Sequence, residues 1–81
     1  MIRQRVLLFA RYAELFGTSE LELTLPDGAR VGDVVAALRQ LPGGDVLPAR
    51  PLVAVNLVHV DSAAPVRPGD EVAVMPPLAG G

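Results

Sequence analysis

The sequence ends in two glycines, and these residues offer the plainest opportunity for chemistry in the chain. Glycine has no Cβ atom, so the carboxylate of Gly81 is unhindered and the backbone at Gly80 can lie close against another protein. Pro76 and Pro77 precede them and favour a stiff, extended backbone that directs the terminus away from the body. Six extended residues, 76–81, span about 20 Å. The segment therefore predicts a tail that places the Gly81 carboxylate inside a partner's active site.

A C-terminal carboxyl group is ionised at neutral pH and is therefore a poor electrophile. A partner enzyme has to activate it, and adenylation by ATP is the usual means, because it converts the carboxylate into a mixed anhydride. A sulfur nucleophile would then leave a thiocarboxylate at Gly81, whereas an amine would leave an amide. The residues alone leave both outcomes open.

The rest of the sequence contains few side chains that could catalyse a reaction. It has no cysteine and no lysine, since all seven basic residues are arginine, and His59 is its single histidine. No thiol, lysine or second histidine can therefore form a nucleophile and base with His59, which we interpret as an exposed or interface residue. The acidic residues lack the spacing of a metal site, and no phosphate-binding loop is present. By elimination, the predicted reactive group is the carboxylate of Gly81.

The composition favours one small folded domain. Hydrophobic residues make up 51% of the 81 residues and charged residues 20%, which is typical of a packed globule. The net charge of −2 does not predict the basic surface of a nucleic-acid-binding protein. The apolar stretches are too short to span a membrane, so we expect a cytoplasmic protein without nucleic-acid or membrane partners. We expect residues 1–75 to form the domain and residues 76–81 to form the tail.

The first half of the chain predicts two strands and two helices. The apolar run at 6–10 predicts a strand at the centre of a sheet, covered on both faces. Residues 11–16 favour a short helix, and Gly17 follows at the position of a left-handed C-terminal cap. Strict alternation of leucine with polar residues at 20–25 predicts a half-buried strand. Apolar residues at helical spacing predict the main helix over 31–41.

The second half predicts three further strands. An irregular crossover is expected at 45–51, followed by a hairpin of strands at 52–55 and 58–60. A turn at 67–70 precedes the last strand, 71–75, which leads into the tail. This order favours an α+β fold of the β-grasp, ubiquitin-like kind, with a mixed sheet of about five strands and the main helix packed across one face. The other face would be free for partners.

Four segments together resemble the small, sulfur-carrier subunits of molybdopterin synthases. They are Phe-Ala-Arg-Tyr-Ala-Glu-Leu-Phe-Gly at 9–17, Ala-Val-Asn at 54–56, Pro-Gly-Asp-Glu-Val at 68–72 and Pro-Pro-Leu-Ala-Gly-Gly at 76–81. The match runs in order through essentially the whole chain. Several ubiquitin-like sulfur carriers share the last two segments, whereas the segment 9–17 points more narrowly to the molybdopterin members.

The resemblance implies a function for the terminus. Gly81 would be adenylated with ATP by an adenylyltransferase similar to ubiquitin-activating enzymes, and a sulfur donor protein would then supply the sulfur of a thiocarboxylate (1-thioglycine). The tail would enter the large subunit of molybdopterin synthase, in a heterotetramer of two small and two large subunits, and donate its sulfur to cyclic pyranopterin monophosphate. The chain would be the non-catalytic subunit, with no metal and no permanently bound cofactor. The expected partner-binding residues are His59, Met75, Pro76, Pro77, Leu78, Ala79 and Gly80.

The sequence departs from the family pattern at a few positions. Leu78 and Ala79 replace the commoner Val-Ser or Val-Thr, Val74 and Met75 stand where relatives often have aromatic residues, and His59 replaces an apolar interface residue. Two other functions stay open. One is a ubiquitin-like sulfur carrier for thiamine or tRNA thiolation, although thiamine carriers are usually shorter and lack the first helix. The other is a ubiquitin-like interaction or modifier protein whose tail carries no sulfur.

Overall fold

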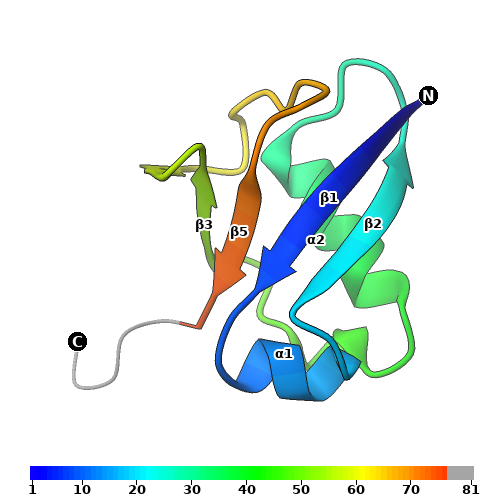
Figure 1. Ribbon diagram of the computed structural model, residues 1–81, viewed down its shortest axis with the longest axis vertical. Helices are drawn as coiled ribbons and strands as arrows, with labels where there is room; N and C mark the ends of the chain where they lie inside the picture. Colours follow the sequence, from blue (N-terminus) through cyan, green and yellow to red (C-terminus); the bar gives the residue numbers. More distant parts are fainter. Residues whose placement is uncertain (77–81) are drawn as a thin grey trace.

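The structure, a computed structural model that describes residues 1–76, is built on one mixed five-stranded sheet (Figure 1). The strand order is β2-β1-β5-β3-β4; β1 pairs with β5 in parallel, and the other neighbours pair antiparallel. The predicted α+β class is confirmed. The elements are β1 (Ile2–Leu8), α1 (Arg11–Phe16), β2 (Glu20–Leu25), α2 (Val31–Gln40), the 3-10 turn η1 (Gly44–Val46), β3 (Leu52–Val55), β4 (Val58–Val60) and β5 (Val72–Met75).

The first strand differs from its prediction in bounds, burial and position. β1 covers Ile2–Leu8 instead of residues 6–10, and its side chains alternate, with Val6 buried and Arg5 exposed. It is half-buried because a helix covers only one face of the sheet. It lies between β2 and β5, so that β5 and not β1 is the middle strand. The prediction was wrong because the apolar run combines the end of a strand with the turn that follows it.

A tight turn at Phe9 and Ala10 ends β1. The N–H of Tyr12 donates to the carbonyl of Phe9 at 3.1 Å, and Ala10 has φ 53° and ψ −132°. These dihedrals are close to the first central position of a type II′ turn, where glycine is favoured because a Cβ atom crowds the backbone. The turn directs the chain into α1, which ends at Gly17 in the predicted left-handed cap, with φ 72°.

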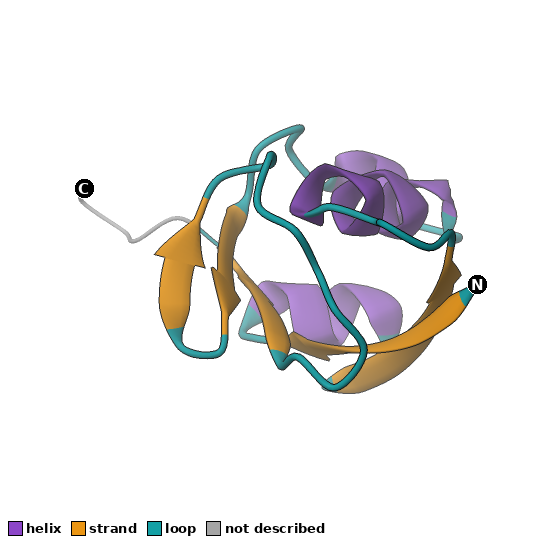
Figure 2. Cartoon of the chain, turned by 90° about the horizontal axis from the view of Figure 1, so that it is seen from above, coloured by secondary structure: helices purple, strands orange, loops and turns teal. Residues whose placement is uncertain are grey.

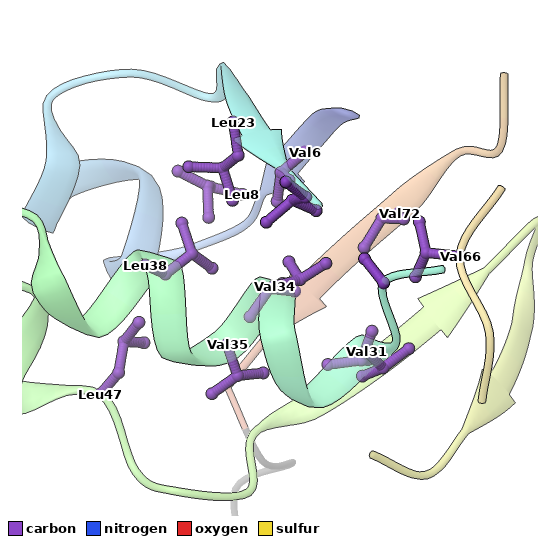
Figure 3. Close-up of a cluster of buried hydrophobic side chains, with 14 of the residues drawn as sticks. Val6, Leu8, Leu23, Val31, Val34, Val35, Leu38, Leu47, Val66 and Val72 are labelled. Carbon is purple, nitrogen blue, oxygen red and sulfur yellow. The ribbon is translucent and has the colours of Figure 1, made fainter. Parts of the chain in front are cut away.

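The main helix, α2, lies against one face of the curved sheet (Figure 2). At its start the carboxylate of Asp33 accepts a hydrogen bond from the N–H of Arg30 at 2.8 Å, and it ends one residue before the predicted Leu41. Its buried side chains face those of the strands (Figure 3), and each fully buried leucine or valine contributes about 1.5–3 kcal/mol. The core includes Val6, Leu8, Leu23, Val31, Val34, Val35, Leu38, Leu47, Val66 and Val72.

The crossover from α2 to β3 is more ordered at its start than the predicted irregular segment, because it contains the turn η1. Gly44, at the start of this turn, is buried against the end of α2, and a Cβ atom there would overlap the carbonyl oxygen of Leu38. Only glycine therefore allows the crossover to pass so close to the helix. This contact helps to hold α2 at its angle across the sheet.

Candidate functional site

The tail predicted to carry the reactive carboxylate follows the middle strand of the sheet. β5 pairs with β1 on one side and β3 on the other (Figure 1). It ends at Met75, and half-buried Pro76 is the last residue described. Because β5 has a partner on each side, its end has a defined position on the body. The remaining predicted site residues lie outside the described part of the chain: Pro77, Leu78, Ala79, Gly80 and Gly81.

Hydrogen bonds tie the turn before β5 to the turn between β3 and β4. The side-chain amide of Asn56 donates from Nδ2 to Oδ1 of Asp70 at 3.0 Å, and its Oδ1 accepts from the N–H of Glu71 at 2.9 Å. Oδ2 of Asp70 accepts from the N–H of Arg67 at 2.8 Å. The bond from Arg67 and then that from Asn56 favour the ionised carboxylate, so the pKa of Asp70 lies below its ordinary value of 3.8. The start of the tail-bearing strand is thus anchored.

A buried glutamine connects this turn to β1. Gln4 is only 1% exposed, and its Nε2 donates to the carbonyl oxygens of Asp70 at 2.7 Å and Arg5 at 2.9 Å. The sequence alone did not predict that Gln4, Asn56 and Asp70 form a connected group. The available signal was the presence of Asn56 and Asp70 in two of the segments that carry the family resemblance.

The face of the sheet opposite α2 brings together two of the predicted partner-binding residues, His59 and Met75. Paired residues of neighbouring strands point to the same face. His59 pairs with Ala54, and Ala54 in turn pairs with Ala73. In the remaining pairs, Ala73 lies beside Leu7 of β1, and Met75 lies beside Leu52. We call this set of six residues the open-face patch: Leu7, Leu52, Ala54, His59, Ala73 and Met75.

The other half of the same face is charged. Arg5 of β1 forms an ion pair with Glu20 of β2 at 3.7 Å, and Arg3 approaches Glu22 at 4.0 Å. These side chains are exposed, so the pairs contribute little to stability. The sheet face thus divides into a charged half on β1 and β2 and a mostly apolar half around β5 and β3. β5, the strand that precedes the tail in the sequence, ends in the apolar half at Met75.

A surface cavity of about 730 Å³ lies elsewhere, between α1 and the crossover. Its polar lining comes from Arg11, Tyr12 and Glu14, which do not form a nucleophile and base pair. Within residues 1–76, no group of three histidine, cysteine, aspartate or glutamate side chains could hold a metal ion. No helix in that range is long and apolar enough to cross a membrane. The full lining of the cavity is Arg11, Tyr12, Glu14, Leu15, Val46 and Pro48.

A mixed sheet with the last strand in the middle and one helix across a single face defines a ubiquitin-like β-grasp protein. The chain belongs to the ThiS family, whose sequence profile matches residues 6–81. Two relatives are named molybdopterin synthase sulfur carrier subunit. The one from Chlamydomonas reinhardtii is 37% identical over 81 residues, covering 95% of this chain and 96% of the relative. The one from Arabidopsis thaliana is 33% identical over 78 residues, with coverage of 95% and 81%.

Solved structures agree with this assignment. The putative molybdopterin converting factor subunit 1 from Pyrococcus furiosus superposes with a TM-score of 0.81 at 28% identity, covering 96% of this chain and 100% of that one. SAMP1 from Haloferax volcanii gives 0.75 at 27% identity, with coverage of 98% and 99%. A complex of subunits 1 and 2 of the molybdopterin-converting factor from Helicobacter pylori contains the same fold, with a TM-score of 0.70, 18% identity and coverage of 99% and 100%. The predicted β-grasp fold and the resemblance to the sulfur carriers are confirmed.

Proposed function

We propose that this chain is the sulfur carrier subunit of a molybdopterin synthase and carries sulfur on the carboxyl group of Gly81. The main structural support is that β5, the paired middle strand that precedes the tail in the sequence, contributes Ala73 and Met75 to the open-face patch. A protein that binds this patch can receive the terminus at the same time. The two relatives that bear this name match 95% of the chain.

The chemistry starts with activation of the terminus. The Gly81 carboxylate attacks ATP in the active site of an adenylyltransferase, forming an acyl adenylate and releasing pyrophosphate. A sulfur nucleophile supplied by a donor protein then attacks the acyl carbon, AMP leaves, and a thiocarboxylate remains. Because this step consumes ATP and needs partner enzymes, we assign the protein to the cytoplasm.

The thiocarboxylate then acts inside the large synthase subunit, where its sulfur is donated to cyclic pyranopterin monophosphate. The open-face patch and the tail residues Pro76 to Gly80 provide the contacts with that subunit, in an assembly of two small and two large chains. In the Helicobacter complex a chain of this fold is bound to a second subunit. The adenylyltransferase needs the same tail, so it and the large subunit bind this chain in turn.

Mass spectrometry tests the carrier function directly. The chain is incubated with an adenylyltransferase, ATP and a sulfur donor, and we expect a mass increase equal to the replacement of one oxygen by sulfur at Gly81. A chain that lacks Gly81 is the control. If the intact chain shows no increase while a known carrier does, the proposed sulfur chemistry is wrong.

A second assay identifies the pathway. The thiocarboxylated chain is mixed with the large synthase subunit and cyclic pyranopterin monophosphate, and we expect molybdopterin to form. Transfer of the sulfur only to a thiamine precursor or to tRNA would instead support one of the other carrier functions.

A second candidate function is protein modification, in which the activated Gly81 forms an amide with a lysine of another protein. The likeness to SAMP1, a small archaeal modifier protein, favours this alternative. Gly81-linked peptides from cellular proteins, in the absence of any thiocarboxylated chain, would support it over the sulfur carrier.

A further inference from the structure

Every cationic side chain of this protein is a guanidinium group. The chain has seven arginines and no lysine, and the structure places all seven arginines on the surface. An activated acyl group at Gly81 would therefore encounter these groups on any neighbouring copy of the chain. The seven residues are Arg3, Arg5, Arg11, Arg30, Arg39, Arg50 and Arg67.

We propose that these arginines make the side-chain surface inert toward the chain's own activated terminus, so that the acyl group reaches an external nucleophile and not a side chain of a second copy. The inference rests on the proposed activation of Gly81. A lysine amine is partly neutral near pH 8 and can attack the acyl carbon. A C–N bond then forms, the bond to the leaving group breaks, and the nitrogen loses a proton. A guanidinium stays protonated and offers no such lone pair.

The other candidate side-chain acceptors are buried, absent or unable to retain the acyl group. Tyr12 is only 4% exposed, and the sequence has no cysteine. His59 is exposed, but an acyl-imidazole is hydrolysed and returns the carboxylate. The α-amino group of Met1 forms an ion pair with Asp27 at 3.0 Å, but both groups are exposed, so this one amine stays reactive and is blocked by acetylation in the thioester test below. Within residues 1–76, therefore, no amine side chain is available to retain the acyl group.

Two exposed positions suit a direct test, and neither belongs to the open-face patch. Arg39 is exposed in the last turn of α2, and Arg50 is exposed in the crossover before β3. R39K and R50K each keep the positive charge and add one amine. R39Q removes the charge without adding an amine, so it is the matched control for an effect of charge alone.

The first experiment needs no activating enzyme. Each full chain is produced with Met1 acetylated during expression, so that only side-chain amines are tested, is converted to a C-terminal aryl thioester by intein cleavage, and is incubated alone at pH 8. We expect the unmodified sequence and R39Q to hydrolyse to the carboxylate. R39K and R50K should form covalent dimers with the mass of two chains less one thiol, and peptide mapping should locate the amide between Gly81 and the new lysine. Dimers of the unmodified sequence at the rate of R39K, or no dimer from either lysine variant, would overturn the inference.

A second experiment separates this inference from the proposed function. The unmodified chain is incubated with the adenylyltransferase and ATP, and release of pyrophosphate is measured. No release, together with the expected thioester results, would refute the proposed activation while the surface remains inert as inferred. Release of pyrophosphate together with thioester dimers of the unmodified chain would refute the inference alone.

Discussion

Removal of Gly81 should abolish the proposed function while leaving the stability of the protein nearly unchanged. Within residues 1–76 the buried core cluster lies between Val6 and Val74, and a glycine has no side chain to add to it. We expect deletion of Gly81 to leave the thermal unfolding midpoint nearly unchanged and to abolish formation of the thiocarboxylate. Calorimetry and mass spectrometry of the same preparation measure both effects. A large fall in the midpoint would show that the terminus contributes to the fold.

Ala10 is a residue at which the backbone stores strain. Its dihedrals, φ 53° and ψ −132°, favour glycine, and such strain costs about 1–3 kcal/mol. Glycine loses about 0.5–1 kcal/mol through its greater freedom in the unfolded chain. We therefore expect Ala10→Gly to raise the free energy of unfolding by about 1 kcal/mol, measured by urea denaturation.

The matched control for this change is Ala13→Gly. Ala13 lies within α1 and is partly buried, so glycine there should destabilise the protein by about 1 kcal/mol. Equal losses of stability at both positions would contradict the strain at Ala10.

At the scale of elements, the two turns joined by Asn56 and Asp70 hold the start of β5 in place. Asn56 has φ 51°, so Asn56→Gly preserves the turn while it removes the side-chain hydrogen bonds. Because these groups are exposed, we expect a loss of only about 1 kcal/mol in the free energy of unfolding. An unchanged free energy of unfolding in a urea titration would show that these bonds contribute nothing net.

Because the pKa of Asp70 is lowered, the stability that this pair of turns contributes depends on pH. Its folded pKa lies below the ordinary 3.8, so the unfolded chain binds a proton more readily. The stabilisation is fully present well above pH 3.8 and is lost as the pH falls through the folded pKa. We expect Asp70→Asn to remove this part of the acid sensitivity in denaturation curves measured between pH 2 and 6. A curve that keeps the full pH dependence of the unmodified chain would contradict this assignment.

The open-face patch combines residues from four strands, so it forms only in the whole folded molecule, where it can contact a partner subunit. His59 is exposed within this patch, and a carboxylate there would be buried without a partner on docking. We expect His59→Glu to weaken binding to the large synthase subunit about tenfold or more, which is about 1.4 kcal/mol. Isothermal calorimetry measures the affinity.

Ala36→Glu is the control for this change, because Ala36 is exposed on α2, on the other side of the sheet. It adds a carboxylate without altering the patch, so it should bind normally. Equal weakening by both variants would point to net charge and not to a defined docking face.

Several elements of the molecule could be predicted because their signals are local. The alternation of leucine with polar residues at 20–25 shows a half-buried strand, and the spacing of apolar residues at 31–41 shows a helix with one buried face. Gly17 marks a helix end because its left-handed conformation depends on the residue itself. The reactive terminus could also be proposed from residue types, since Gly81 follows a chain without thiols or amine side chains.

The bounds of β1 could not be predicted in the same way. An apolar run does not show whether a second layer covers a strand, because that depends on where the helices pack. The network around β5 has a similar origin, since Gln4 and Asp70 are 66 positions apart and yet share a hydrogen bond. The open-face patch likewise consists of residues that meet through strand pairing. Residue types and short-range spacing thus predicted a reactive group at Gly81, whereas contacts between distant segments position β5, the strand that precedes the tail.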